Sequence, residues 1–239
     1  MLGRIALRIA SVEALKGNTL VGDNVLDSQI GALDVASDSS IRTDQEKPFI
    51  SIYVEGGRVT DGLDLRALHR TGQTDFTIET GITTSMVVTD PDTGVSEVIP
   101  GLPATDRAFE FYLDAVGRQI VNAMSDPDNE WAEIWRGLCS GVSKIERKRT
   151  SDAASGTRIA AHQLVMTLDL LPDPVFGQPL APTSIWARFF AKLQAVEHEM
   201  LPILLMLIGD QSSTAEFCEE RRRYGLTFDE VRALLVPQP

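Results

Sequence analysis

The segment VSKIERKRTSDAASGTRIAAHQLVMTLDL, residues 142–170, has the composition of two long β-strands joined by a small polar linker. In its second half, apolar side chains occupy every second position from Leu164 to Leu170. Because the side chains of a strand alternate between the two faces of a sheet, this pattern buries one face. The segment therefore predicts a long antiparallel hairpin, with strands at 142–149 and 157–170, that lies against a hydrophobic core.

Basic side chains gather at one end of this predicted hairpin, although the chain as a whole is acidic. Its 22 lysines and arginines and its 34 aspartates and glutamates give a net charge of −12. Two interpretations carry similar weight: charged strand ends discourage aggregation, or the cluster contacts an acidic partner surface such as a neighbouring subunit. Contact with passing DNA is a third and weaker interpretation, because phosphate repels an acidic chain. The cluster comprises Lys144, Arg147, Lys148, Arg149 and Arg158.

The chain begins with a helical pattern and continues into a polar segment. Apolar residues at three- and four-residue steps predict a helix over residues 2–16. Residues 25–30 form a short extended piece. The polar segment 31–47 is predicted to be mostly a long loop of the kind that carries contacts or becomes ordered on assembly. Asp38 and Arg42 are its candidate contact residues.

Strand patterns follow this loop. A run of β-branched and aromatic residues that begins with proline predicts a strand over residues 48–54, which Gly56 and Gly57 should end. Residues 75–89 have the pattern of one long strand or two. A turn rich in Asp and Pro then leads into a returning strand at 95–99, so this part of the chain predicts a second hairpin.

Helices are predicted on both sides of the 142–170 hairpin. Thr105 is a suitable cap for the first of them, and prolines between residues 172 and 179 mark a boundary after the hairpin. Two capping boxes near the end of the chain, Ser213 with Glu216 and Thr227 with Glu230, predict the last two helices. The predicted helices span residues 106–124, 129–138, 185–196, 200–208, 214–224 and 228–235.

These elements together favour an α+β fold. We expect a mixed, largely antiparallel sheet flanked by helices over residues 1–175, followed by an all-helical C-terminal appendix over residues 176–239. The longest apolar run, residues 201–208, is far too short to span a bilayer, and charged residues interrupt the apolar positions at the N-terminus. The sequence therefore predicts a soluble protein.

The sequence carries no recognisable signature of catalysis, cofactor binding or metal binding. It lacks the phosphate-binding glycine motifs and the nucleophile-elbow motif. The histidines, His69, His162 and His198, lie far apart, and His198 lacks the second histidine that a zinc helix motif requires. His162 is expected on a strand, as a partner-facing or a hydrogen-bonded core residue. Cys139 and Cys218 are distant from each other, as expected of small core residues in a reducing compartment. We expect no catalytic residues, no cofactor and no metal.

Four segments of the chain resemble a known family. They are LRIASVEAL at 7–15, GDNVLDS at 22–28, PFISIY at 48–53 and GTRIAAHQL at 156–164. Their order is similar to that of the tail terminator (minor tail) proteins of long-tailed bacteriophages and related prophage particles. The resemblance covers roughly residues 2–170, rests on structural rather than catalytic motifs, and leaves the C-terminal helices without a counterpart.

The resemblance implies a structural virion protein rather than an enzyme. Terminators form a ring, usually six-fold, that caps the growing tail tube and then joins the tail to the head connector. The implied partners are other copies of the chain, the tail tube protein and the connector or neck protein; no membrane is involved, and DNA at most passes through the ring. The protein would be assembled in the host bacterial cytoplasm and end in the tail or neck of the virion. The contacts are expected in segments 31–47 and 142–158, because ring interfaces join two different surfaces of each subunit.

Two other functions remain open at this stage. Another neck or head–tail connector component would have the same class of partners but a different stoichiometry. An enzyme with a dispersed site, built from Asp, Glu or His side chains of distant segments, is a less favoured alternative. It would show a concave pocket that holds several ionisable groups with shifted pKa values.

Overall fold

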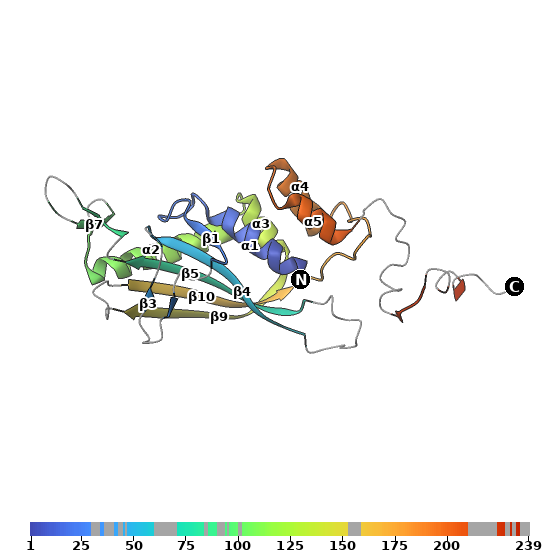
Figure 1. Ribbon diagram of the computed structural model, residues 1–239, viewed down its shortest axis with the longest axis horizontal. Helices are drawn as coiled ribbons and strands as arrows, with labels where there is room; N and C mark the ends of the chain where they lie inside the picture. The colour runs from blue at the N-terminus through green and yellow to red at the C-terminus, as the bar shows by residue number, and fades with distance from the viewer. Residues whose placement is uncertain are drawn as a thin grey trace.

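The chain has an α+β architecture, which confirms the predicted fold class (Figure 1). Five helices and a five-stranded mixed sheet account for most of the residues that the structure describes. In this part of the chain, none of the helices combines the length and the apolar character needed to cross a bilayer. The computed structural model describes residues 1–29, 34–35, 41–42, 45, 47–59, 71–83, 86–89, 94, 96–99, 102–152, 159–209, 224–227, 230 and 233–234.

The main sheet has the strand order β1-β4-β5-β10-β9. Strands β1 and β4 are parallel, and the other neighbouring pairs are antiparallel. Strands β9 and β10 form the predicted long hairpin, and β9 lies at the edge of the sheet. The strands are β1 (Val25–Asp27), β4 (Phe49–Arg58), β5 (Gln73–Thr83), β9 (Cys139–Asp152) and β10 (Ile159–Leu170).

Three helices pack on one face of this sheet (Figure 1). Each agrees with its predicted span to within one residue at either end. The side chain of Thr105 accepts a hydrogen bond from the N–H of Ala108 and so caps the second helix, as predicted. Asn129 caps the third helix in the same way, through the N–H of Ala132. The helices are α1 (Leu2–Leu15), α2 (Asp106–Ser125) and α3 (Glu130–Gly137).

A residue far along the chain caps the first helix. The N–H groups of Leu2 and Gly3 both donate to the carboxylate of Asp173, each over 2.8 Å. The first N–H groups of a helix have no partner within the helix, and they carry the positive end of its dipole. The Asp173 carboxylate satisfies both requirements, so it fastens the start of α1 to the end of the β9–β10 hairpin.

The hydrophobic core lies between the sheet and the helices and continues under the last two helices. Phe76 of β5 is fully buried, and its ring centroid lies 5.7 Å from that of Trp135 in α3. Phe189 and Leu204, from the last two helices, belong to the same cluster of buried side chains. Both helices confirm the prediction made for the segment after the prolines. They are α4 (Ile185–Ala195) and α5 (Leu201–Ile208).

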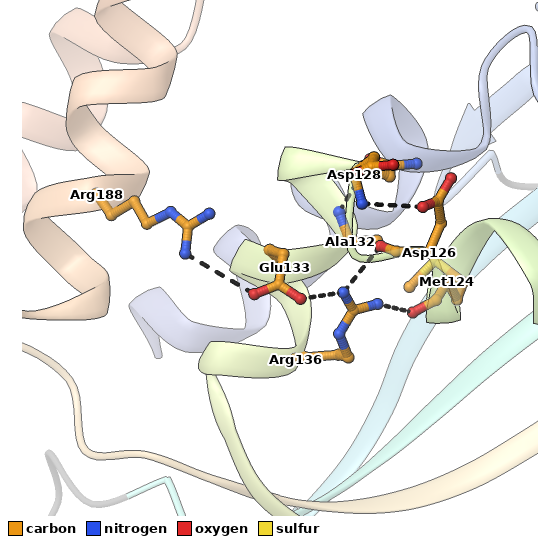
Figure 2. A network of polar contacts seen from close by, with 8 residues as sticks. Met124, Asp126, Asp128, Ala132, Glu133, Arg136 and Arg188 are labelled. Carbon is orange, nitrogen blue, oxygen red and sulfur yellow. Dashed lines mark hydrogen bonds and ion pairs between the residues drawn. The ribbon is translucent and has the colours of Figure 1, made fainter.

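A polar network anchors α4 to α3 (Figure 2). Arg136 of α3 donates to the carbonyl oxygens of Met124 and Asp126 and also pairs with Glu133. The other Glu133 carboxylate oxygen lies 3.9 Å from the guanidinium of Arg188 in α4. One carboxylate thus links the end of α2, α3 and α4. Of the helices predicted beyond α5, the structure describes only parts, and the 175/176 boundary remains a prediction.

The second predicted capping box is confirmed. The N–H and the hydroxyl of Thr227 donate to the Glu230 carboxylate over 2.6 and 2.8 Å, and the Glu230 N–H donates back to the Thr227 hydroxyl oxygen over 3.3 Å. The box predicted at Ser213 and Glu216 lies outside the described residues.

The structure corrects two predictions about β4 and the loop before it. Gly56 and Gly57 do not end β4; the strand continues through them to Arg58, with a one-residue bulge opposite Asp75. A bulge lets a strand accommodate glycines that would otherwise end it. The predicted loop of residues 31–47 contains a small antiparallel pair, because strands of two residues are too short to show a periodicity. The pair is β2 (Asp34–Val35) and β3 (Ile41–Arg42).

The hairpin predicted around residues 84–99 is present but belongs to a three-stranded sheet. Its two strands pair antiparallel, as predicted, and a third strand joins the second one. The third strand was not predicted, because it has two residues and one of them is proline. The strands are β6 (Val88–Thr89), β7 (Ser96–Ile99) and β8 (Leu102–Pro103).

Candidate functional site

Four of the predicted contact residues lie along the edge strand β9. Its register with β10 places Arg149 opposite His162 and Arg147 opposite Leu164, so both arginines are on the sheet face that carries the helices. The other two residues, Lys144 and Lys148, belong to the opposite face. The cluster that the sequence predicted as one patch is therefore split between the two faces of an edge.

Of the three remaining predicted contact residues, the structure describes only the backbone of one. Asp38 and Arg158 lie outside the described residues. The backbone of Arg42 lies in β3, where it pairs with Asp34, and its side chain is likewise outside the description. The predicted contact role of these three residues stays a prediction.

A groove runs between α2 and the β9–β10 hairpin on the helix side of the sheet, and it has a volume of about 410 Å³. Its floor is apolar and its rim is basic. Floors of this kind bury apolar side chains of a ligand or partner, while the polar groups around them fix its orientation. The apolar lining comes from Ile78, Leu113, Ile120, Val121 and Leu164, and the charged lining on this face from Arg118, Arg147, Arg149 and the carboxylate of Asp114.

An ion-pair network closes one end of this groove. The guanidinium of Arg149 contacts Glu110 Oε1 of α2 over 2.6 and 2.8 Å. Glu110 Oε2 lies 3.2 Å from His162 Nε2, and Asp114 Oδ1 lies 3.7 Å from His162 Nδ1. Half-buried His162 therefore contacts two carboxylates of α2, which agrees with the interpretation of a hydrogen-bonded residue. The network ties α2 to the edge of the sheet.

This network keeps Glu110 ionised as the partner of the Arg149 guanidinium, which does not favour a role in acid–base catalysis. The hydrogen bond from Arg149 is the main cause that lowers the pKa of Glu110 below its usual value of 4.5, and the contact with His162 acts in the same direction. A carboxylate that is difficult to protonate is a poor general acid or base near neutral pH. Arg118 and Arg147 form no ion pair within the described part of the chain. The rim can therefore bind an acidic surface.

The contribution of α2 to this site was not predicted from the sequence. Glu110, Asp114 and Arg118 follow one another at steps of four residues, so they share one face of the helix. This spacing is visible in the sequence beside the apolar positions of the same helix. What the sequence does not show is which strand that face meets, because the pairing of α2 with β9 and β10 is a long-range contact.

A second polar cluster lies on the sheet face away from α2. Glu79 of β5 is buried and accepts a hydrogen bond of 2.7 Å from the side-chain amide of Gln163. Burial is the main cause that raises the pKa of Glu79 above 4.5. Neighbouring Tyr53, whose pKa burial also raises, donates its hydroxyl hydrogen to the carbonyl oxygen of Gln29 over 3.1 Å. The carboxyl and the phenol are hydrogen-bonded within the chain, as structural polar groups of a core are.

The two glutamates should give opposite pH dependence of stability. Glu110 has a lowered pKa in the folded state, so its stabilisation is present above pH 4.5 and is lost as the pH falls through the folded pKa. Glu79 has a raised pKa in the folded state. Its contribution to the free energy of unfolding is therefore most favourable below pH 4.5 and declines as the pH rises through the folded pKa. We expect Glu110→Gln to lower the free energy of unfolding at neutral pH, and with it the melting temperature; the loss should be less than about 1 kcal/mol, because the ion pair is partly exposed. We expect Glu79→Gln to raise the melting temperature.

Melting temperatures recorded from acidic to neutral pH test both expectations. The difference between wild type and Glu110→Gln should shrink as the pH falls below 4.5. The advantage of Glu79→Gln should grow as the pH rises above 4.5. Parallel pH profiles for the wild type and the two variants would contradict the assigned environments.

The described residues offer no metal centre and one cysteine with an inert environment. No group of three or more His, Cys, Asp or Glu side chains within the described ranges is arranged to hold a metal ion. Cys139 is free and half-buried against the core, and burial raises the pKa of its thiol to about 12. A thiol with so high a pKa is a weak nucleophile. Cys139 thus behaves as the core residue that was predicted, and Cys218 lies outside the described residues.

The function of the groove has to be inferred from its own chemistry. No protein-family model matches the chain, and a search of curated proteins finds no match. Its apolar floor, its mostly basic rim and the adjacent edge of β9, which pairs with no further strand among the described residues, have the properties of a surface that binds another protein.

Proposed function

We propose that the chain is a structural subunit that assembles with copies of itself into a ring and terminates the tail tube of a long-tailed bacteriophage or related particle. The ring caps the tube and joins it to the connector at the head, so the mature protein resides in the tail or neck of the virion. Support comes from the resemblance over residues 2–170 and from the described edge of the sheet. The mixed sheet flanked by helices is also the fold that the resemblance implies.

The observation that carries this proposal is the edge strand β9. It is 14 residues long, and in the described part of the chain no strand pairs with its outer side. Val142 and Ile145 are exposed on it, near the basic residues Lys144 and Arg147. A long edge with apolar side chains readily pairs with another chain, and charges on it restrict that pairing to a complementary partner. An edge of this kind suits a subunit whose sheet pairs with a neighbouring subunit in an assembly.

A neck or connector component is the second candidate, because the same edge and groove would serve it. The two candidates have the same class of partners and differ in stoichiometry and in position on the particle. A terminator ring should bind the end of a purified tail tube, whereas a connector component should bind the head portal in the absence of tubes.

The solution mass of the full chain tests the proposal. Light scattering on a gel-filtration column should give a mass near six subunits, and negative-stain images should show rings, either for the chain alone or after addition of tail tubes. A chain that stays monomeric at high concentration and does not bind to tail tubes would contradict the ring.

Reversing one charge on the groove rim should weaken this assembly. Arg147→Glu places a like charge where an acidic neighbour is expected, and a loss of roughly tenfold in assembly affinity is the expected scale for one such contact. Arg107→Glu is the matched control, because Arg107 is also exposed and lies on α2 but does not line the groove. Sedimentation velocity gives the dissociation constant of the assembly for each of the two variants. Equal effects of the two variants would show that net charge, rather than the groove, controls assembly.

A further inference from the structure

Helix α5 exposes an apolar surface that the described residues leave uncovered. All eight of its residues, Leu201–Ile208, are apolar, and only Leu204 and Ile208 are buried. Because a helix turns once in 3.6 residues, Ile203 and Met206 point away from the core, and both are exposed. A continuous apolar patch of this kind on a surface marks a site of protein interaction.

Carboxylates flank this patch at its beginning. Glu197 and Glu199 are exposed in the turn that leads from α4 into α5. The α5 surface, defined here as the exposed apolar residues of α5 with these two glutamates, is therefore apolar in the middle and acidic at one end. Helix α5 itself has no charged residue that could offset this charge.

The groove between α2 and the β9–β10 hairpin has the complementary properties. Its floor is apolar, and Val121 is partly exposed there. Its rim is basic on balance, because Arg118, Arg147 and Arg149 line it with one carboxylate, that of Asp114. The volume of about 410 Å³ is on the scale of a few large apolar side chains rather than a whole domain. An apolar helix flanked by acidic residues matches both the floor and the rim.

The two surfaces lie apart in the folded chain. Figure 1 shows α5 beside α4, on the side where α1 begins, whereas α2 and the arrowhead of β9 lie farther to the left. Two different, complementary surfaces that lie apart on a subunit can form a head-to-tail interface between copies, and such interfaces close into rings when the rotation between subunits allows it.

We propose that the α5 surface of one subunit docks into the α2–β9 groove of the next copy of this chain. Ile203 and Met206 lie against the apolar floor, and Glu197 and Glu199 face the basic rim. The inference rests on the proposed ring and names the two surfaces that build it. It also assigns a role to the C-terminal helices, for which the resemblance gives none.

The first test links the two surfaces by a disulfide between copies. One chain carries Met206→Cys, the other carries Val121→Cys, and both carry Cys218→Ser. Met206 is 69% exposed and Val121 is 36% exposed, so each substitution should leave the fold intact. The thiol of Cys139 remains unreactive, because burial raises its pKa to about 12. We expect mild oxidation of the mixed ring to give a dimer that contains one chain of each kind.

Leu20→Cys in place of Val121→Cys is the matched control. Leu20 is 43% exposed and contacts α2 through its backbone, but it does not line the groove. Equal linking of the two cysteines would overturn the docking, as would a dimer linked only between Met206→Cys chains. An assembled ring without any link would mean that α5 faces another protein or residues 210–239 of its own chain, so the docking would fail and the ring would stand. Failure to form a ring with tail tubes would overturn the proposed function itself.

The second test uses the charge of the groove rim. Met206→Lys brings a cation into a groove whose charged lining is mostly basic, whereas Met206→Glu brings in an anion at the same exposed position. We expect the lysine variant to dissociate the ring at concentrations where the glutamate variant remains assembled, and Arg147→Glu in the same chain to restore the lysine variant. Equal ring stability of the two Met206 variants would overturn the docking, because both substitutions remove the same apolar side chain.

Discussion

Replacing Phe76 by alanine is expected to lower the free energy of unfolding by about 3–5 kcal/mol. Phe76 has no exposed surface, and it stands in the central strand β5, where its ring meets Trp135 of α3. The truncation removes the apolar contacts of a whole ring and leaves a cavity between the sheet and the helices, which a packed core cannot fully close. Urea unfolding followed by circular dichroism measures the loss.

Phe111→Ala supplies the control with identical chemistry. Phe111 belongs to α2 and is 59% exposed, so its truncation should change the free energy of unfolding by less than about 0.5 kcal/mol. If the two alanine variants lost similar free energies, Phe76 would not be the core residue that the fold requires. Tryptophan fluorescence should change only in the Phe76 variant, because the contact with Trp135 is specific to it.

Replacing Gly81 by alanine should cost about 1–3 kcal/mol, although it adds a single methyl group. Gly81 of β5 lies directly opposite Phe49 of β4 in the sheet. A Cβ at this position would come within 2.5 Å of Cζ of the Phe49 ring. Phe49 is fully buried, so the ring has no free space into which it can move. The backbone of β4 or β5 would have to shift instead.

Two further variants separate this clash from the general effect of replacing glycine. Gly117→Ala in α2 should stabilise the protein by about 0.5–1 kcal/mol, because a Cβ there would meet no atom within 4 Å and alanine favours a helix. Phe49→Leu in the Gly81→Ala background should recover part of the loss, since the two side chains compete for one volume. A purely additive double mutant would contradict the clash.

The sequence was sufficient to predict the elements with strong local signals. The β9–β10 hairpin was predicted from its alternating pattern, and α2 from its apolar stripe and from the cap at Thr105. Local patterns do not encode strands of two residues, so β2, β3 and β8 were missed. The continuation of β4 past Gly56 depends on its pairing with β5, and this pairing outweighs the local preference of glycine for a turn.

The candidate site was less predictable than the fold. The basic residues of β9 were visible as a cluster, but the sequence could not show that strand alternation would divide them between two faces. The opposing wall of the groove includes Asp114 and Arg118 of α2, which precede β9 by about 20–25 residues. The contacts between α2 and the hairpin depend on the three-dimensional fold, so no local sequence pattern predicts them. The apolar composition of α5 was visible, but its exposure was not.

The cap that Asp173 provides for α1 also determines when this protein can fold during its synthesis. The N–H of Leu2 and the carboxylate that receives it are 171 residues apart in the chain. At translation rates of about 5–20 residues per second, the first helix waits roughly 10–30 s for its cap. A helix of 14 residues is marginal by itself in water, and strand β5 likewise lacks its β10 neighbour until residues 159–170 have been made. A nascent chain that stalls before the end of the hairpin therefore presents an apolar helix and an incomplete sheet to chaperones and proteases.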